Sequence, residues 1–390
     1  MKHSTRLMTG VAAFAAVALA LTGCSPGGTT DEDVAAPTTD PGTAETTDLT
    51  PVTLQLQWFA QAQFGGYYAA LDQGYYKDEG LDVTLQEGGA DIVPQDALVS
   101  GDADYAISWV PKVLGSIQQG ANITSVAQIF ERSGTLQVSF KDKNLTSAAD
   151  LKGHTVGSWG YGNEWEIFAG LQQAKVGIDD VTMVTQGFDM LGLLQGDIDA
   201  AQAMTYNEYA QVLETINPDT GKLYQPEDLN VIDWNKEGSG MLQDSIWADA
   251  DKLASDPAYQ ETTVKFLKAS IKGWIYVMND PQASADIVTA AGSTLGTSHQ
   301  LWMANEVNKL IWPSTNGIGI TDDAAWARTV DIALKTANDT GATILTEAPP
   351  ATAHTNEYVQ KALDELIAEG VDVKGTGYTP IDVVLNEGGN

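Results

Sequence analysis

The chain has 390 residues, with 20 Lys and Arg against 52 Asp and Glu, so its formal net charge is −32 at pH 7. This acidity argues against nucleic acid and anionic lipid headgroups as ligands, because both carry charge of the same sign. The length exceeds what one ordinary core organises and suits a protein with two lobes.

The N-terminal residues have the features of a secretory signal. Lys2 and Arg6 precede an uncharged stretch, 7–23, that is rich in Ala, Leu, Val and Phe and is short for a membrane span. The stretch runs into Leu-Thr-Gly-Cys, ending at Cys24, which resembles the lipobox of bacterial lipoproteins. We therefore predict a lipoprotein signal peptide over 1–23, a lipid on Cys24, and a mature protein anchored to the cell membrane on its extracytoplasmic side.

The segment after the signal is expected to be a tether. Residues 24–50 are mostly Ser, Pro, Gly, Thr, Asp, Glu and Ala, so they cannot bury enough apolar surface to fold. Cys24 is the only cysteine of the sequence, which excludes a disulfide or a cysteine metal site within one chain.

The folded part opens with alternating strands and helices. Val52, Leu54, Leu56 and Trp58 alternate with polar residues, as in a half-buried strand. Continued alternation predicts an α/β fold whose mainly parallel sheet is flanked by helices. The expected helices of this run are 64–73, 92–100 and 111–119, and the expected strands are 81–85, 104–108 and 123–129.

A second run of the same kind follows Leu145, and long helical segments follow Met241. The helical tail most simply packs back on the first lobe, so we predict that 51–134 and 239–390 form lobe 1 and that 135–238 form lobe 2. The expected strands are 155–159, 181–185, 200–204, 229–233 and 242–247. The expected helices are 164–175, 189–195, 207–215, 258–278, 281–291, 299–310, 322–339 and 355–368.

In open α/β sheets the ligand site lies beyond the carboxyl ends of the strands. The residues that follow the predicted strands are rich in aromatics, amides, acids and glycines. The candidate ligand-binding residues are Trp58, Phe59, Gln61, Gln63, Phe64, Tyr67, Gly89, Trp109, Trp159, Tyr161, Asn163, Glu164, Phe188, Asp189, Tyr206 and Glu208.

These side chains predict the chemistry of a ligand. Aromatic rings provide stacking area, and amides and carboxylates provide orienting hydrogen bonds. None of these loops contributes Arg or Lys, so a flat, neutral or weakly cationic heteroaromatic suits them better than a phosphate or sulfonate.

Structural roles compete with ligand binding at several of these positions. Trp58 ends a strand and fits core packing almost as well. Tyr67 lies along a helix, where tyrosines commonly serve the core or the surface. The segment 205–208 reads Thr-Tyr-Asn-Glu and matches a capping box, which would occupy the Glu208 carboxylate with backbone.

Signatures of catalysis are absent from the sequence. His154, His299 and His354 follow the signal peptide far apart and in no His-x-x-x-His arrangement, which leaves metal catalysis unsupported. No Gly-x-Ser-x-Gly elbow, Walker A loop or dinucleotide fingerprint occurs. We expect no cofactor, no metal and no enzymatic activity.

Four stretches resemble one known superfamily. They are 57–70 (Gln-Trp-Phe-Ala-Gln-Ala-Gln-Phe-Gly-Gly-Tyr-Tyr-Ala-Ala), 74–83 (Gly-Tyr-Tyr-Lys-Asp-Glu-Gly-Leu-Asp-Val), 101–108 and 151–157. They are similar to the ABC importer binding proteins that include binders of thiamine pyrimidine precursors, riboflavin and alkanesulfonates. The resemblance runs from about residue 52 to residue 340.

The resemblance implies a type II periplasmic-binding fold with two hinge crossovers, here near 131–138 and 234–242. It also implies lobes that close around a small molecule and are then read by an ABC permease and its ATPase. A monomer is the default for this fold.

Several functions stay open from the sequence. A thiamine pyrimidine precursor ranks ahead of riboflavin, because the Trp58 block and 206–208 look most similar to those binders. An alkanesulfonate binder would need a cation at the cleft, for which Lys112 and Arg132 are the nearest candidates. The thiamine-pyrimidine-synthesising enzymes of the same fold would need a reactive histidine, and a ligand-sensing lipoprotein would look identical in sequence.

Overall fold

A computed structural model describes residues 49–390. The predicted signal peptide, the lipidation at Cys24 and almost all of the tether lie outside this range. The α/β fold class is confirmed in the described part of the chain. The prediction of mainly parallel sheets is wrong, because two pairings of the large sheet and both pairings of β5 are antiparallel.

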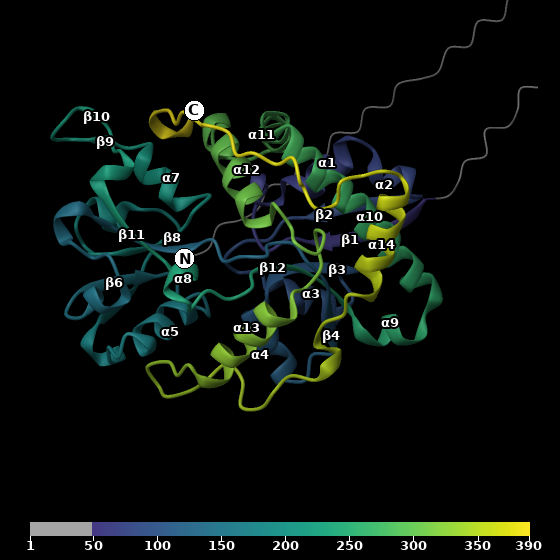
Figure 1. Ribbon diagram of the computed structural model, residues 1–390, viewed down its shortest axis with the longest axis horizontal. Helices are drawn as coiled ribbons and strands as arrows, with labels where there is room; N and C mark the ends of the chain where they lie inside the picture. Colours follow the sequence, from purple (N-terminus) through teal and green to yellow (C-terminus); the bar gives the residue numbers. More distant parts are fainter. Residues whose placement is uncertain (1–48) are drawn as a thin grey trace, which may run out of the picture. The chain divides into compact units, whose positions relative to one another are not determined.

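The large sheet has five strands in the order β2-β1-β3-β12-β4 (Figure 1). Strand β1 pairs in parallel with β2 and β3, whereas β12 runs antiparallel between β3 and β4. The chain leaves this sheet at the carboxyl end of β4 and re-enters at the same end through β12, so β12 has to run in the opposite direction. The strands are β1 (Thr50–Gln55), β2 (Leu81–Gln86), β3 (Tyr105–Trp109), β4 (Ile123–Gln128) and β12 (Asp244–Asp249).

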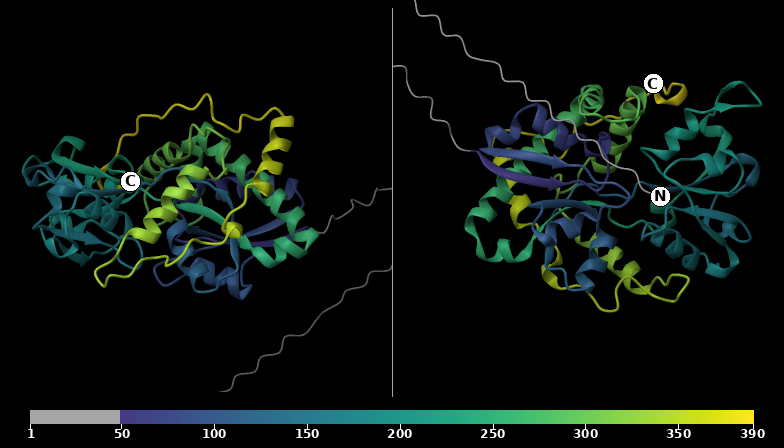
Figure 2. Two further views of the ribbon diagram at one scale, coloured as in Figure 1. Left: turned by 60° about the horizontal axis from the view of Figure 1, so that its bottom comes forward. Right: turned by 180° about the vertical axis from the view of Figure 1, so that it is seen from behind.

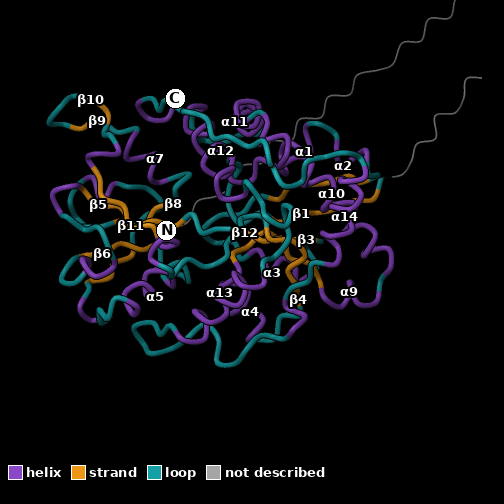
Figure 3. The backbone as a smooth tube through the Cα atoms, in the orientation of Figure 1, coloured by secondary structure: helices purple, strands orange, loops and turns teal. Residues whose placement is uncertain are grey.

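Helices cover both faces of the large sheet (Figure 3). Leu54, Tyr105 and Ile246 pack toward one helical layer, whereas Ala106 and Trp247 pack toward the other, as the period of two along a strand requires. The first layer contains α1 (Gly65–Asp72), α2 (Tyr75–Asp78), α10 (Pro257–Asn279), α11 (Pro281–Ala290), α12 (Thr297–Ile311), α14 (Glu357–Ala368) and the 3-10 turn η1 (Ala62–Phe64); the second contains α3 (Pro94–Ser100), α4 (Val110–Gln118) and α13 (Asp323–Lys335). Helix α9 (Ala250–Ser255) follows β12, and η6 is Ala351–Ala353.

A second group, the small-side strands, comprises an antiparallel sheet β11-β5-β8 and a parallel pair β6-β7. A parallel bridge between Val156 and Ala200 joins β6 to the start of β8. The strands are β5 (Thr135–Phe140), β6 (Thr155–Ser158), β7 (Thr182–Thr185), β8 (Ala201–Met204) and β11 (Leu229–Asp233), with a hairpin of β9 (Ile216–Asn217) and β10 (Lys222–Leu223). Their helices are α5 (Trp165–Gln173), α6 (Leu191–Leu194), α7 (Glu208–Leu213), α8 (Trp234–Glu237), η2 (Lys141–Lys143), η3 (Ala148–Leu151), η4 (Ile178–Asp180) and η5 (Pro226–Asp228).

Two connections join the large sheet to the small-side strands. Residues 129–134 link β4 to β5, and residues 238–243 link α8 to β12. The first connection is shorter than the predicted crossover at 131–138, because β5 already begins at Thr135. The division into lobes at residues 134 and 238 stays a prediction.

The C-terminal segment runs from α14 to the small-side helix α7 (Figure 2). On the way, the backbone N–H of Ile381 donates to Asn305 of α12, 2.9 Å away. In the final turn η7 (Glu387–Gly389), the N–H of Gly388 donates to the carbonyl of Glu214 at 3.0 Å. The segment therefore contacts elements on both sides of the two connections.

No helix within residues 49–390 is long and apolar enough to cross a bilayer.

Candidate ligand-binding site

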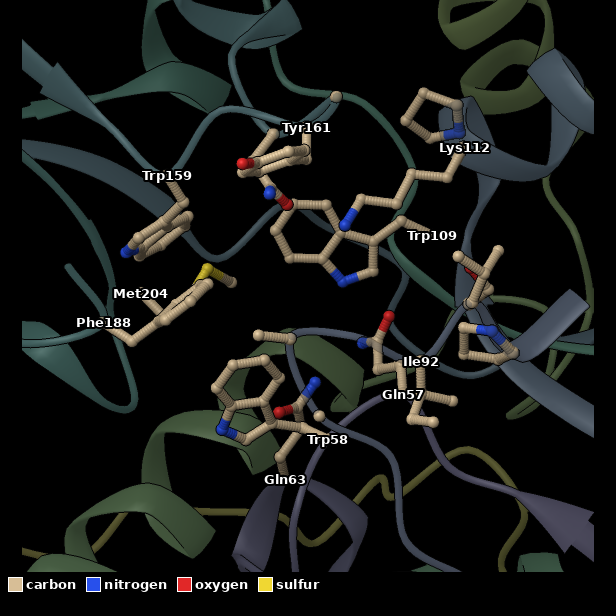
Figure 4. A pocket seen from close by; sticks show the side chains of 18 of the residues that line it. Gln57, Trp58, Gln63, Ile92, Trp109, Lys112, Trp159, Tyr161, Phe188 and Met204 are labelled. Carbon is tan, nitrogen blue, oxygen red and sulfur yellow. The ribbon is translucent and has the colours of Figure 1, made fainter. Parts of the chain in front are cut away.

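A cavity of about 430 Å³ opens where strand ends from both groups meet (Figure 4). The volume lies within the range of about 300–1,000 Å³ that is common for small-molecule sites. Its walls come from segments after the carboxyl ends of β1, β2 and β3 on the large sheet and of β6, β7 and β8 on the small side. This is the position at which α/β sheets bind ligands.

Most of the candidate residues from the sequence line this cavity. They are Trp58, Gln61, Gln63, Gly89, Trp109, Trp159, Tyr161, Asn163, Phe188, Tyr206 and Glu208. Their roles in ligand binding stay predictions.

Five candidates do not line the cavity. Phe64 and Tyr67 are 0% and 1% exposed and belong to the core under α10, because η1 and α1 turn their side chains into the protein. The ring of Phe59 lies outside, beside Trp58 and Gly89. Glu164 and Asp189 accept hydrogen bonds from the backbone N–H groups of Gly162 and Leu191, so their carboxylates organise their own loops.

Aromatic rings from both strand groups meet on one wall. The rings of Trp58 and Phe188 lie 4.7 Å apart between centroids, and Trp159 stacks on Phe188 at 6.5 Å with an interplanar angle of 16°. Trp58 follows β1, whereas Trp159 and Phe188 follow β6 and β7. The wall therefore exists only while the two groups of strands are close together.

Tyr161 lies at the mouth of the cavity and is 90% exposed. Its φ of 53° is in the left-handed region, which is uncommon for a residue with a side chain, and both flanking glycines share positive φ. Strained backbone of this kind concentrates at functional sites.

A buried carboxylate organises the floor of the cavity. Asp244 is 2% exposed and accepts hydrogen bonds from Gln57 at 2.7 Å, Trp109 Nε1 at 2.8 Å and Gln63 at 2.9 Å. Burial raises its pKa to about 6, while these donors favour the ionised form. Gln63 in turn accepts a hydrogen bond from Gln61 at 2.6 Å. Asp244 and Gln57 were not among the sequence candidates.

On the small side, Gln202 of β8 holds the loop after β6. Its side-chain oxygen accepts from the Ser158 hydroxyl at 2.8 Å and from the Trp159 N–H at 3.1 Å. Its amide group donates to the Asn163 carbonyl at 2.6 Å. Trp159 and Asn163 are thereby fixed at the cavity by one buried side chain.

Glu208 lines the cavity without forming the predicted capping box. Asn207 occupies the N-cap of α7 and makes no capping hydrogen bond. The Glu208 carboxylate accepts from the Met204 N–H at 2.9 Å and from the Asn207 amide at 3.0 Å, and burial raises its pKa to about 7. Asn207 also contacts His299 of α12 at 3.0 Å, and His299 is hydrogen-bonded to Glu214 at 2.9 Å.

The cavity contains a cation that the strand-exit loops did not predict. Lys112, in the first turn of α4, lines the cavity, with Nζ 5.2 Å from the centre of the Trp109 ring. Burial lowers its pKa to about 8, against the opposing effect of Glu164 and Asp244. Arg132, the other candidate cation, is absent from the lining and donates to the carbonyls of Lys309 and Pro313. The strand-exit loops contribute no Arg or Lys to the lining, and the cation comes instead from α4, at the residue that the alkanesulfonate alternative named.

Further lining residues were missed by the sequence analysis. They include Ile92, Val93, Pro94 and Gln95 before and within α3, and Ser108, Trp165, Met204, Asn207 and Ile344 elsewhere. Trp165 carried a signal, because it directly follows Glu164, the last residue of a recognised strand-exit segment.

The described histidines and acids offer no metal centre. His154, His299 and His354 lie outside the cavity lining, and His154 pairs with Asp199. Among residues 49–390, no group of three or more His, Cys, Asp or Glu side chains is placed to hold a metal ion.

Known structures share this fold. The periplasmic aliphatic sulphonate binding protein SsuA of Escherichia coli superposes with a TM-score of 0.55 at 14% identity, covering 72% of this chain and 90% of that protein. A Candida albicans protein described as having the generic periplasmic binding protein fold superposes with a TM-score of 0.51 at 16% identity, over 86% and 99%. The chain therefore has the fold of the periplasmic binding proteins.

Within that fold, residues 61–284 match the family model described as NMT1/THI5 like, which is more than half of the chain. The chain belongs to the NMT1/THI5-like family.

Named relatives include binding proteins and enzymes. The riboflavin-binding protein RibY of Chloroflexus aurantiacus is 26% identical over 80% of this chain and 88% of that protein. A formylaminopyrimidine-binding protein of Halalkalibacterium halodurans is 26% identical over 62% and 70%. A 4-amino-5-hydroxymethyl-2-methylpyrimidine phosphate synthase of Aspergillus parasiticus is 23% identical over 63% and 72%.

Proposed function

We propose that the protein is the extracytoplasmic substrate-binding subunit of an ABC importer and that its ligand is a small heteroaromatic compound, either a thiamine pyrimidine precursor or riboflavin. The ligand would be held between two lobes, 51–134 with 239–390 and 135–238, and delivered to a permease. A lipid on Cys24 would keep the protein at the membrane, and mass spectrometry of the membrane-extracted chain would detect the acyl groups.

The aromatic cavity at the strand ends is the observation that carries this proposal. Trp58, Trp109, Trp159 and Phe188 offer ring faces on which a flat ligand can stack, while Gln57 and Gln63 are held in place by Asp244. Stacking surfaces combined with a few fixed polar groups are typical of sites that recognise flat ligands. The two relatives named as binding proteins bind ligands of this class.

Binding is favoured over synthesis of the pyrimidine. The enzymes of this fold that the sequence resembles use a histidine as a substrate, whereas the three described histidines lie outside the cavity lining. His299 reaches the cavity only through Asn207, and both of its ring nitrogens are hydrogen-bonded.

Lys112 favours one second candidate, an alkanesulfonate or similar anion as ligand. A partly buried ammonium group in a cavity can bind a sulfonate oxygen. The aromatic lining, however, exceeds what a small aliphatic sulfonate could contact.

Calorimetric titration and thermal melting of the full chain test the proposal. The probes are riboflavin, formylaminopyrimidine, thiamine and taurine. A ligand at 100 times its Kd should stabilise the protein by about 2.7 kcal/mol. We expect stabilisation by riboflavin or the pyrimidine.

Two aromatic variants make this test specific to the cavity. Trp58→Ala removes a ring from the wall and should abolish the stabilisation. Phe59→Ala is the matched control, because Phe59 neighbours Trp58 without lining the cavity. Stabilisation by taurine alone would contradict the heteroaromatic ligand, and equal loss in both variants would contradict the proposed wall.

A further inference from the structure

The acidic and amide side chains at the floor of the cavity are hydrogen-bonded, although the buried Nε1 of Trp159 has no partner among the described residues. Asp244 accepts three hydrogen bonds, Glu208 accepts two, and the side chains of Gln61 and Gln63 form one chain that ends on Asp244. Groups engaged in this way can shape a ligand site without requiring a ligand to satisfy them.

Lys112 is different. Within residues 49–390, its Nζ has no hydrogen-bond acceptor and no ion-pair partner, although it lines the cavity and is partly buried. Its side chain extends from α4 toward the middle of the cavity, between Trp109 and Tyr161 (Figure 4). An ammonium group has three donors and no acceptor, so removing it from water is unfavourable unless oxygen atoms replace the water.

The surroundings of Lys112 limit what can supply those oxygens. Trp109 is fixed because its Nε1 donates to Asp244, and its ring face lies 5.2 Å from the ammonium nitrogen. A flat ligand stacked on the cavity's aromatic rings would therefore have one edge near Nζ. An oxygen at that edge would be attracted, whereas a positive charge there would be repelled.

We propose that Lys112 determines ligand selectivity: it selects flat rings that present a carbonyl, formyl or carboxylate oxygen beside Nζ and rejects rings that are cationic at that edge. This inference rests on the proposed function and narrows its ligand class. Oxygen-bearing pyrimidines and flavins satisfy the requirement, whereas an aminomethyl group, which is protonated at neutral pH, does not.

A pair of probes with the same ring tests the selection. The first is formylaminopyrimidine, and the second is the same pyrimidine with a free aminomethyl group in place of the formylamide. Hydrogen bonds to charged groups change affinity by about ten- to a hundredfold. We expect the full chain to prefer the formylated probe by at least that lower factor, measured as a ratio of Kd values from calorimetry.

Three variants assign the preference to Lys112. Lys112→Gln should reduce the ratio to near one, and Lys112→Arg should retain it, because the guanidinium keeps the charge. Lys265→Gln is the matched control: it removes the same charge from the exposed face of α10, where Lys265 pairs with Glu261. The ratio is insensitive to a loss of folded protein, since both probes report on the same preparation.

The outcomes separate this inference from the proposed function. A wild-type ratio in Lys112→Gln overturns the role of Lys112, even if the heteroaromatic function holds. If the wild type binds 2-naphthalenesulfonate and neither pyrimidine nor riboflavin, the proposed function fails. In that case, loss of sulfonate binding in Lys112→Gln still supports the selection of oxygen by Lys112. Sulfonate binding that is retained in Lys112→Gln overturns this role of Lys112.

Discussion

Asp244 links three segments of the chain through one carboxylate. Gln57 and Gln63 both lie in the segment after β1, and Trp109 is the last residue of β3. The carboxylate oxygens of Asp244 therefore fix side chains that follow or end two different strands. Three N–H donors to one carboxylate offset part of the free energy that is lost when the charged group is removed from water. The floor of the cavity therefore depends on the ionised form of this residue.

Replacing Asp244 with Asn tests this dependence. The amide nitrogen of Asn cannot accept a hydrogen bond, so at least one of the three donors loses its partner. We expect a loss of about 2–3 kcal/mol in the free energy of unfolding, together with weaker ligand binding. Chemical denaturation and calorimetry measure the two effects. Asp251→Asn, which removes an exposed charge in the first turn of α9, should change neither; wild-type stability in Asp244→Asn would contradict the assignment.

At the scale of elements, α5 ties the two connections between strand groups together. Glu166 of α5 is 5% exposed and accepts from the Ser133 hydroxyl at 2.9 Å and from the Met241 N–H at 2.7 Å. Ser133 lies in the first connection and Met241 in the second. Gln243 adds a hydrogen bond to the N–H of Gly134 at 2.7 Å.

The pH dependence of stability should report on Glu166. Burial raises its pKa from the ordinary value of 4.5 to about 7, so the folded protein holds this proton more tightly than the unfolded chain does. The contribution of Glu166 to the free energy of unfolding is therefore fully present below pH 4.5. It is lost as the pH rises toward 7, by up to about 3 kcal/mol.

Glu166→Gln imitates the protonated acid and isolates that contribution. Denaturation curves at pH 5 and pH 8 should show the variant gaining stability relative to the wild type as pH rises. Other buried acids affect both proteins equally and cancel in the comparison. Glu227→Gln, an exposed substitution near β11, provides the control and should follow the wild type at both pH values; parallel curves for Glu166→Gln would contradict the raised pKa.

The elements that sequence reasoning could predict were those with a local pattern. Alternation at Val52 and Leu54 identified β1, which ends at Gln55, before Leu56 and Trp58 of the predicted pattern. The long helices after Met241 were also predicted. Strand β5 was missed because its polar members are buried: Gln137 is 1% exposed and donates to the carbonyls of Gly157 and Ala200. These hydrogen bonds, which offset the burial of Gln137, come from segments distant in sequence. The residues around β5 therefore show no local pattern that predicts a strand.

The site was predictable to the extent that it follows parallel strands. Trp58, Trp109 and Trp159 were found from the rule that ligands lie beyond carboxyl ends. Asp244 was missed for a geometric reason: β12 is antiparallel, so its amino end reaches the same edge of the sheet. Only a prediction of strand direction would have revealed it.

At the scale of the whole described molecule, the proposed function predicts that the two strand groups move apart and close again around a ligand. Trp58 and Phe188 come from the two strand groups and are in contact on one wall of the cavity, so a separation of the groups would divide that wall. Residues 129–134 and 238–243 are the covalent links about which such a motion would turn. Binding then shifts a population of open molecules toward closed ones.

Spin labels on opposite sides of the cavity would detect this shift. Cysteines at the exposed positions Asp91 and Gln195 lie in the loop after β2 and at the end of α6. Riboflavin or formylaminopyrimidine should move the distance distribution measured by electron paramagnetic resonance to shorter values. Labels at Asp91 and Lys77, both within the large-sheet part, should not respond. An unchanged distribution for the first pair, with binding demonstrated, would contradict closure.

The position of β12 has a consequence for how the chain folds. This strand lies between β3 and β4 in the large sheet but is the last of the five in sequence, because residues 129–243 separate it from β4. Until it arrives, β3 and β4 each lack a neighbour and expose unpaired edges, which are prone to aggregation. Pairing over such a sequence separation is slow. A nascent chain interrupted before residue 243 would thus have a divided sheet, whereas all of its small-side strands would already be present.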